Sequence, residues 1–197
     1  MKILRKIFGP YKDEVWAQLA HEFGGDFLEG GLWNKDVVHV QVGTWEIVLD
    51  TFTRTQGKHN TTYTRIMAPF TNRDDFYFKI YRAGFFTGVA KYFGMKDIQL
   101  NDDFFDKEFV IKGNDEFKIT WILDNPAVKE QLTKAEYVHF EIKNNEGHFW
   151  NNDYHDGIDE LYFEKRGVIK NIDELRHLFQ LFALILDKIT ELDSGYA

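Results

Sequence analysis

The C-terminal run from Ile172 to Leu192 constrains the fold of this chain more than any other stretch. Its apolar residues recur at alternating spacings of three and four, which is the period of an amphipathic α-helix. Asn171, with Glu174 three residues later, is a capping arrangement for the start of that helix. Further leucines and isoleucines make its middle apolar nearly all round, so it is either buried against a sheet or presents one face to a partner chain.

Strands are predicted upstream of this helix by alternation of apolar and polar residues. Valines alternate with polar residues in 38–42, and similar patterns follow in 45–49 and 76–81. We interpret residues 26–82 as an antiparallel meander of four or five strands. A helix is expected before them, beginning at Pro10 and ending at Gly24-Gly25.

The second half of the chain mixes short strands and helices. Residues 115–123 fit either a strand or a helix, and we favour a helix because Gly113-Asn114 supplies a cap. That helix is expected to break at Asn125-Pro126 and resume to Lys134. The remaining predictions are a short helix in 83–93 and strands in 98–100, 108–111, 137–143, 148–150 and 161–164.

Together these patterns predict an α+β fold, in which an antiparallel, aromatic-rich sheet carries an N-terminal helix and a long C-terminal helix packed on it. The length of 197 residues fits a single compact domain, residues 1–197. A soft internal boundary is expected near 95–100, where the composition turns acidic.

Composition narrows the classes of function. The chain has no cysteine, which excludes disulfides, thiol catalysis and cysteine-based metal sites. Its net charge of −8 argues against general nucleic-acid binding. Neither a secretory signal nor a transmembrane segment is recognisable, so a cytoplasmic location is expected.

One candidate site is the outward face of the predicted meander. Tyr63 and Arg65 share one face of a strand, and Tyr77, Lys79 and Tyr81 share one face of the next predicted strand. Aromatic rings interleaved with bases can stack a planar group and hold a phosphate, which suggests a small anionic ligand. The same residue types also occur on an ordinary solvated sheet face.

A second candidate is a divalent-metal site formed by His139, His148, Asp153 and His155. Imidazole and carboxylate groups suit zinc, manganese or iron, and such a site could serve a metal-dependent hydrolase. His139 is expected on the outward face of its strand together with Glu141. The spacing matches no known metal motif, and Asn, Asp and Gly in 151–157 are ordinary turn residues. We therefore predict no resident cofactor, and keep the metal site as an alternative.

The acidic loop 101–106 is a third candidate, because paired carboxylates can do acid–base chemistry. We expect instead that Phe104-Phe105 anchors this loop in the core and leaves the acids solvated. The sequence contains no nucleophile elbow, phosphate loop or dinucleotide-binding fingerprint.

In residues 78–192, Phe105-Asp106, Phe109-Val110, Gly113 and Asp115 precede a helical stretch, a strand pair and a long final helix. On these residues the stretch resembles a class of uncharacterised bacterial domains of unknown function. Some members of that class are preceded by membrane helices, which this sequence lacks. Since the class has no assigned activity, the resemblance implies no site residue and makes an enzyme less expected.

The sequence thus favours a non-catalytic, cytoplasmic binding or protein-interaction module. Its expected partners are another protein or a small anionic ligand, and a homodimer through the C-terminal helix is a further possibility. The alternatives are the anionic-ligand face and the metal-dependent hydrolase.

Overall fold

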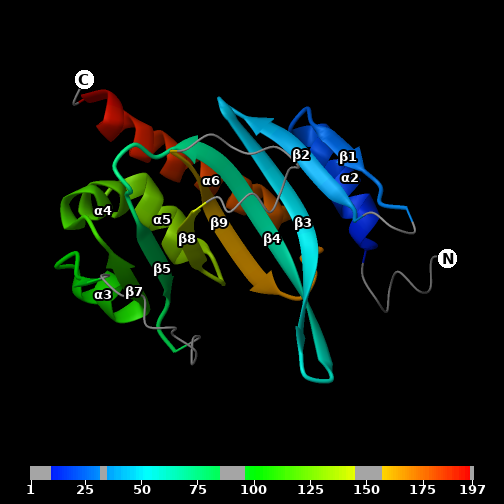
Figure 1. Ribbon diagram of the computed structural model, residues 1–197, viewed down its shortest axis with the longest axis horizontal. Helices are drawn as coiled ribbons and strands as arrows, with labels where there is room; N and C mark the ends of the chain where they lie inside the picture. The colour runs from blue at the N-terminus through cyan, green and yellow to red at the C-terminus, as the bar shows by residue number, and fades with distance from the viewer. Residues whose placement is uncertain (1–9, 32–34, 85–95, 145–156, 196–197) are drawn as a thin grey trace. The chain divides into compact units, whose positions relative to one another are not determined.

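The computed structural model describes residues 10–31, 35–84, 96–144 and 157–195. The fold is α+β, with a nine-stranded antiparallel sheet in the order β1-β2-β3-β4-β9-β8-β5-β7-β6 (Figure 1). It has an N-terminal helix, a long C-terminal helix and buried aromatic residues, as the sequence predicts.

The bounds of the elements are as follows. The helices are α2 (Lys12–Glu22), α3 (Asp103–Glu108), α4 (Glu116–Leu123), α5 (Pro126–Lys134) and α6 (Ile172–Gly195). The strands are β1 (Asp26–Leu28), β2 (Val37–Val42), β3 (Trp45–Gln56), β4 (His59–Thr71), β5 (Phe78–Arg82), β6 (Lys96–Ile98), β7 (Phe109–Gly113), β8 (His139–Asn144) and β9 (Ile158–Arg166).

The chain divides into two compact units. Unit 1 comprises Met1–Ala68 and Glu164–Gln180, and unit 2 comprises Pro69–Phe163 and Leu181–Ala197. Strands β4 and β9 and helix α6 each run through a unit boundary. A single domain with a soft internal boundary near 95–100 stays a prediction.

Unit 1 is built on the meander β1 to β4, with α2 beside it (Figure 1). The indole N–H of the buried Trp16 in α2 donates to the carbonyl oxygen of Ile169 at 3.1 Å. The first half of α6 also contacts the end of α2, where the Phe23 and Phe179 ring centroids lie 5.7 Å apart. An indole donor, once buried, needs such an acceptor, so this contact fixes the N-terminal helix to the C-terminal part of unit 1.

Unit 2 places β5 between β8 and β7, with β6 beyond β7. Phe140 on β8 packs against Phe163 at 5.3 Å and against Phe182 of α6 at 5.4 Å between ring centroids. Gly113 ends β7, where a Cβ atom would lie 2.5 Å from the backbone carbonyl oxygen of Tyr77 and 2.1 Å from Ile119 Cδ1 of α4. Because the Tyr77 oxygen belongs to the backbone and cannot easily move, only glycine fits at this end of the strand.

The structure confirms several local predictions and corrects one. Residues 116–123 form a helix and a second helix resumes at Pro126, as predicted. Strand β5, however, does not continue the meander, because β9 and β8 lie between β4 and β5 in the strand order. Local alternation identifies a strand but not its neighbour, since pairing depends on residues far away in sequence. The predicted helix in 83–93 and strand at 148–150 fall largely outside the described residues.

Helix α6 buries much of its apolar surface within the chain itself. Its buried apolar side chains are Leu175, Leu178, Phe179, Leu181, Phe182, Ile185, Leu186, Ile189 and Leu192. Burial within the chain therefore accounts for most of the apolar stripe, and a homodimer through this helix stays a prediction. No helix in the described parts of the chain has the length and apolar character needed to cross a membrane.

Candidate functional site

The residues of the predicted Tyr/Arg/Lys face do not lie on neighbouring strands. Tyr63 and Arg65 belong to β4 in unit 1, whereas Lys79 and Tyr81 belong to β5 in unit 2 and Tyr77 directly precedes β5. The expected adjacency fails for the reason given above: the strand after β4 in the chain is not its neighbour in the sheet.

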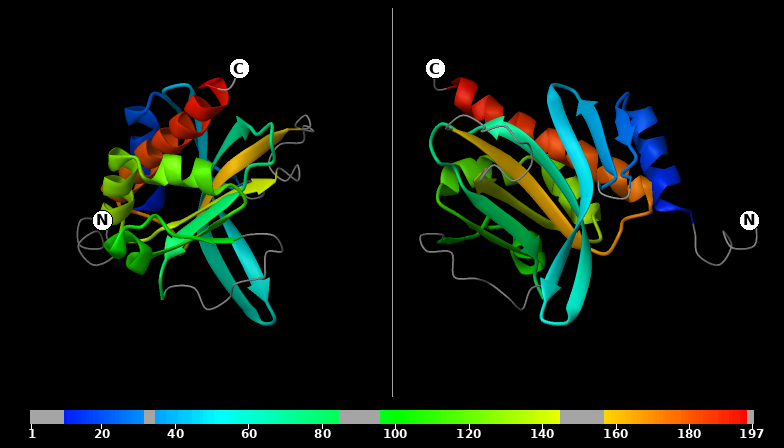
Figure 2. Two further views of the ribbon diagram at one scale, coloured as in Figure 1. Left: turned by 90° about the vertical axis from the view of Figure 1, so that its left-hand side faces the viewer. Right: turned by 45° about the vertical axis from the view of Figure 1, so that its right-hand side comes forward.

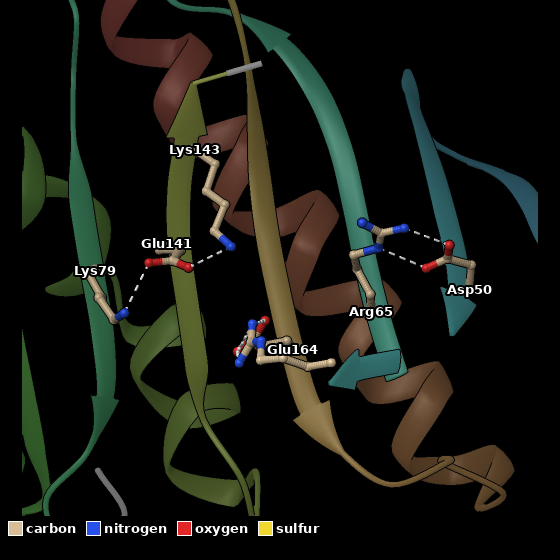
Figure 3. Close-up of polar contacts among 7 residues, drawn as sticks. Asp50, Arg65, Lys79, Glu141, Lys143 and Glu164 are labelled. Atoms are coloured by element: carbon tan, nitrogen blue, oxygen red, sulfur yellow. Dashed lines mark hydrogen bonds and ion pairs between the residues drawn. The ribbon is translucent and has the colours of Figure 1, made fainter. Parts of the chain in front are cut away.

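In unit 1, Arg65 is held by a carboxylate. Its Nε and Nη2 atoms donate to the two oxygens of the buried Asp50 at 2.8 and 2.7 Å (Figure 3). The Arg65 guanidinium also lies 5.1 Å from the Phe52 ring centroid. A two-point pair of this kind is strong and fixed in direction, so an incoming anion would have to displace Asp50.

The aromatic part of this face is present and ordered. Phe52 and Tyr63 are directly paired across β3 and β4, and their rings stack with centroids 5.3 Å apart. Arg54 lies 4.8 Å from the Tyr63 centroid and reaches the buried Glu164 at 3.2 Å. The stacked rings therefore lie next to two arginines, and each arginine is paired with a carboxylate of the same chain: Arg65 with Asp50 and Arg54 with Glu164.

In unit 2, Lys79 and Tyr81 are buried, which corrects the expectation of a solvated face. Lys79 Nζ lies 3.0 Å from Glu141 Oε2, and Lys143 Nζ lies 3.1 Å from Glu141 Oε1 (Figure 3). Burial by itself would raise the pKa of Glu141, but the charges of Lys143 and Lys79 hold that pKa below its ordinary value. This cluster is a closed charge network rather than an open ligand platform.

The metal site stays a prediction. His139 lies on β8 and shares a face with Glu141, as expected, but that face is buried and His139 is only 2% exposed. His148, Asp153 and His155 lie outside the described residues. Within the described ranges, no group of three or more His, Cys, Asp or Glu side chains is arranged to hold a metal ion.

The acidic loop contains a short helix, and two of its acids have structural roles. Asp102 caps α3 by accepting from the Phe105 N–H, and it pairs with Lys129 at 3.0 Å. The hydrogen bond from the Phe105 N–H lowers the pKa of Asp102 most, and the hydrogen bond from Lys129 lowers it further. Asp106 accepts from the backbone N–H of Leu100 at 2.8 Å. Phe105 is buried as expected, but Phe104 is 58% exposed, so only one of the two rings anchors the segment.

A surface that sequence reasoning missed lies on α4. Phe117 and Trp121 are 60% and 50% exposed, and they are one helical turn apart on the same face. With Thr120, Asp124 and Asn125 they line a hollow of about 360 Å³, which we call the α4 hollow. The signal was present in the sequence: once 116–123 is a helix, these two aromatics fall on the face opposite Ile119, Ile122 and Leu123.

Local sequence explains how the α4 hollow is built. Asp115 caps α4 by accepting from the Lys118 N–H at 3.0 Å, and the buried face of the helix holds Ile119 and Ile122 in the core. Asn125 then caps α5, accepting from the N–H groups of Ala127 and Val128, with Pro126 in the first turn. Two helices joined this tightly leave Asp124 and Asn125 at the end of the hollow.

Asp124, which lines the hollow, belongs to a cluster with a net negative charge. Lys129 lies 2.6 Å from Asp124 and 3.0 Å from Asp102, so one cation is shared by two carboxylates and the three groups sum to −1. Burial would lower the pKa of Lys129, but hydrogen bonds with Asp124 and Asp102 raise it above its ordinary value. Glu116, one turn before Thr120, is exposed and adds a further negative charge on this side of α4.

Comparison of the chain with protein-family models, with curated proteins and with solved structures found no match. The resemblance to uncharacterised bacterial domains is therefore neither supported nor opposed by these comparisons and stays a prediction.

Proposed function

We propose that this chain is a non-catalytic protein-interaction module whose α4 hollow holds a basic, partly apolar segment of another protein. The observation that carries the proposal is the pair Phe117 and Trp121, both at least half exposed and lining one hollow. Exposed aromatic clusters of this kind are typical of interaction sites on soluble proteins.

The physical argument begins with the cost of exposure. A Phe or Trp side chain gains about 1.5–3 kcal/mol when it moves from water into an apolar contact. Helix α4 packs without either ring, because Ile119, Ile122 and Leu123 already fill its buried face. A partner that covers both rings therefore gains free energy that folding leaves unused, and tryptophan is among the residues that most often dominate such contacts.

Charge selects the kind of partner. The shared Lys129 leaves the Asp102–Asp124 cluster with a net negative charge, and Glu116 adds to it. An apolar segment that carries Lys or Arg can cover both rings and lie beside the Asp102–Asp124 cluster, whereas an acidic segment is repelled by that cluster. We therefore assign the hollow to cationic, amphipathic segments.

The test uses three synthetic peptides of equal length, in which Leu alternates with Lys at helical spacing, Leu with Glu, or Ser with Lys. We expect only the Leu/Lys peptide to bind, measured by calorimetry, and to shift the amide signals of residues 117–124 in NMR spectra. Trp121→Ala should weaken this binding tenfold or more, as expected for loss of a dominant contact of about 2 kcal/mol. Glu116→Gln, which removes one exposed charge, should weaken it about two- to threefold.

Phe104→Ala is the matched control, because Phe104 is exposed to a similar degree on α3 but does not line the hollow. Its binding should equal that of the unmodified chain. The proposal fails if the Leu/Lys peptide does not bind, if the Leu/Glu peptide binds equally well, or if Trp121→Ala and Phe104→Ala have the same effect.

The other sequence-based hypotheses have less support. An anionic ligand on the arginine face of unit 1 would have to compete with Asp50 and Glu164 for both arginines. The metal-dependent hydrolase rests on residues that are mostly outside the described part of the chain. A cytoplasmic location remains a prediction from the sequence.

A further inference from the structure

The outer half of the β3–β4 hairpin is paired on one side only. β3 pairs with β4 without interruption from Val48↔Met67 to Gln56↔His59. On its other side, β3 pairs with β2 only from Trp45 to Leu49. Within the part of the chain that the structure describes, the segment 51–56 of β3 has no strand along its outer edge, and the hairpin extends past the end of β2 (Figures 1 and 2).

This edge lacks the devices by which proteins usually block edge strands. The segment 51–56 reads Thr-Phe-Thr-Arg-Thr-Gln, with no proline and one charged residue, and its register with β4 contains no bulge. Thr and Phe also favour extended backbone. An edge of this composition is suited to pairing with another strand.

The sequence of the edge is complementary to itself. In an antiparallel pair of two copies centred on Thr53, Thr51 faces Thr55 of the other copy and Phe52 faces Arg54. Threonine pairs across strands are favourable, and a guanidinium beside an aromatic ring adds a cation–π contact. No two like charges meet in this register. A two-fold axis through Thr53 therefore matches every position from 51 to 55.

We propose that a second copy of this chain adds to the β3 edge, so that the two hairpins form a four-stranded antiparallel sheet β4-β3-β3-β4 centred on Thr53. The contact lies wholly on unit 1 and does not depend on the α4 hollow. It is closed by the two-fold axis, which makes the product a dimer rather than a fibre.

Cysteine cross-linking tests the register directly, because the chain has no cysteine of its own. Cα atoms that face each other in an antiparallel pair are about 4.5–5.5 Å apart, within the range of about 4.4–6.8 Å that a disulfide spans. Thr53→Cys should therefore oxidise to a covalent dimer, at least tenfold faster than Thr62→Cys. Thr62 is also exposed and pairs with Thr53 on the same hairpin, but two copies of it would lie about 14 Å apart across three strand spacings.

A mixture of Thr51→Cys and Thr55→Cys chains should cross-link faster than either variant alone, because these positions face each other only in the proposed register. Thr53→Lys should shift the chain from dimer to monomer in analytical ultracentrifugation, and adding Thr53→Asp chains should restore a mixed dimer. The proposal is overturned if Thr53→Cys and Thr62→Cys oxidise at the same rate, or if the unmodified chain is monomeric at the concentration used for cross-linking.

Discussion

Unit 1 and unit 2 each bury a carboxylate on a strand, but different cations neutralise the two. In unit 1, Asp50 meets one guanidinium, which occupies both of its oxygens. In unit 2, Glu141 is shared between Lys79 and Lys143, each of which contacts one oxygen. The first arrangement is one carboxylate bound by one guanidinium with fixed geometry, whereas in the second one carboxylate lies between two ammonium groups.

The difference shows two ways to compensate a buried carboxylate. One is a pair of directed hydrogen bonds from a single cation, and the other is the combined charge of several nearby cations. The Asp50–Arg65 pair depends on the planar fork of arginine, which lysine cannot imitate. Glu141 depends on the summed charge of its neighbours, which is why the pKa of this carboxyl is shifted downwards despite burial. Substitutions that alter charge or shape should therefore act differently in the two units.

The largest effect is expected for Glu141→Gln. This change keeps the shape of the side chain but removes the negative charge that the buried Lys79 contacts, which should cost about 3 kcal/mol of unfolding free energy. Urea denaturation of both proteins measures the difference. Glu130→Gln is the control, because Glu130 pairs with Lys134 on an exposed helix surface and should lose less than about 0.5 kcal/mol. Equal losses in the two variants would show that Glu141 does not hold a network.

A smaller loss of unfolding free energy is expected for Arg65→Lys. The positive charge is retained, but the second hydrogen bond to Asp50 and the contact with the Phe52 ring disappear, which should cost about 1–2 kcal/mol. The same denaturation experiment measures it. A variant as stable as the unmodified chain would mean that charge alone suffices in unit 1, and the contrast between the units would then vanish.

The smallest expected effect is a dependence of the unfolding free energy on pH, caused by Glu141 in unit 2. The pKa of Glu141 is lowered from its ordinary value of 4.5 in the folded chain, so the unfolded chain takes up a proton first as the pH falls. The stabilisation by Glu141 is complete above that ordinary value and declines as the pH falls through the lowered pKa. The stability difference between the unmodified chain and Glu141→Gln should therefore narrow on acidification from about pH 7 to about pH 3. A difference that widens over this range contradicts the assignment.

Much of the fold could be predicted because its signals are local. The spacing of the apolar residues from Ile172 onward and the Asn171 cap predict α6, and Asn125-Pro126 predicts the break between α4 and α5. The position of β5 could not be predicted in this way. Its neighbours, β8 and β7, come from residues further along the chain, and nothing in the alternation of Phe78 and Ile80 encodes them.

The candidate site was harder to predict because burial depends on partners far away in sequence. Lys79 and Glu141 both look like solvent-facing residues on their own strands, yet they pair with each other across β5 and β8 and are buried. Phe117 and Trp121 look like core residues, yet they are exposed. In each case the burial that the residue type favours is the opposite of the burial in the structure.

The composition of unit 1 has a consequence for the order of events during synthesis. Its meander emerges from the ribosome within the first 68 residues, but the remaining part of the unit begins only at Glu164. Until Ile169 has been made, the Trp16 indole lacks its acceptor, and the Thr64 hydroxyl lacks the Gly167 carbonyl to which it donates. The nascent meander therefore stays incomplete while nearly 100 further residues are translated, a delay of about 5–20 seconds at about 5–20 residues per second.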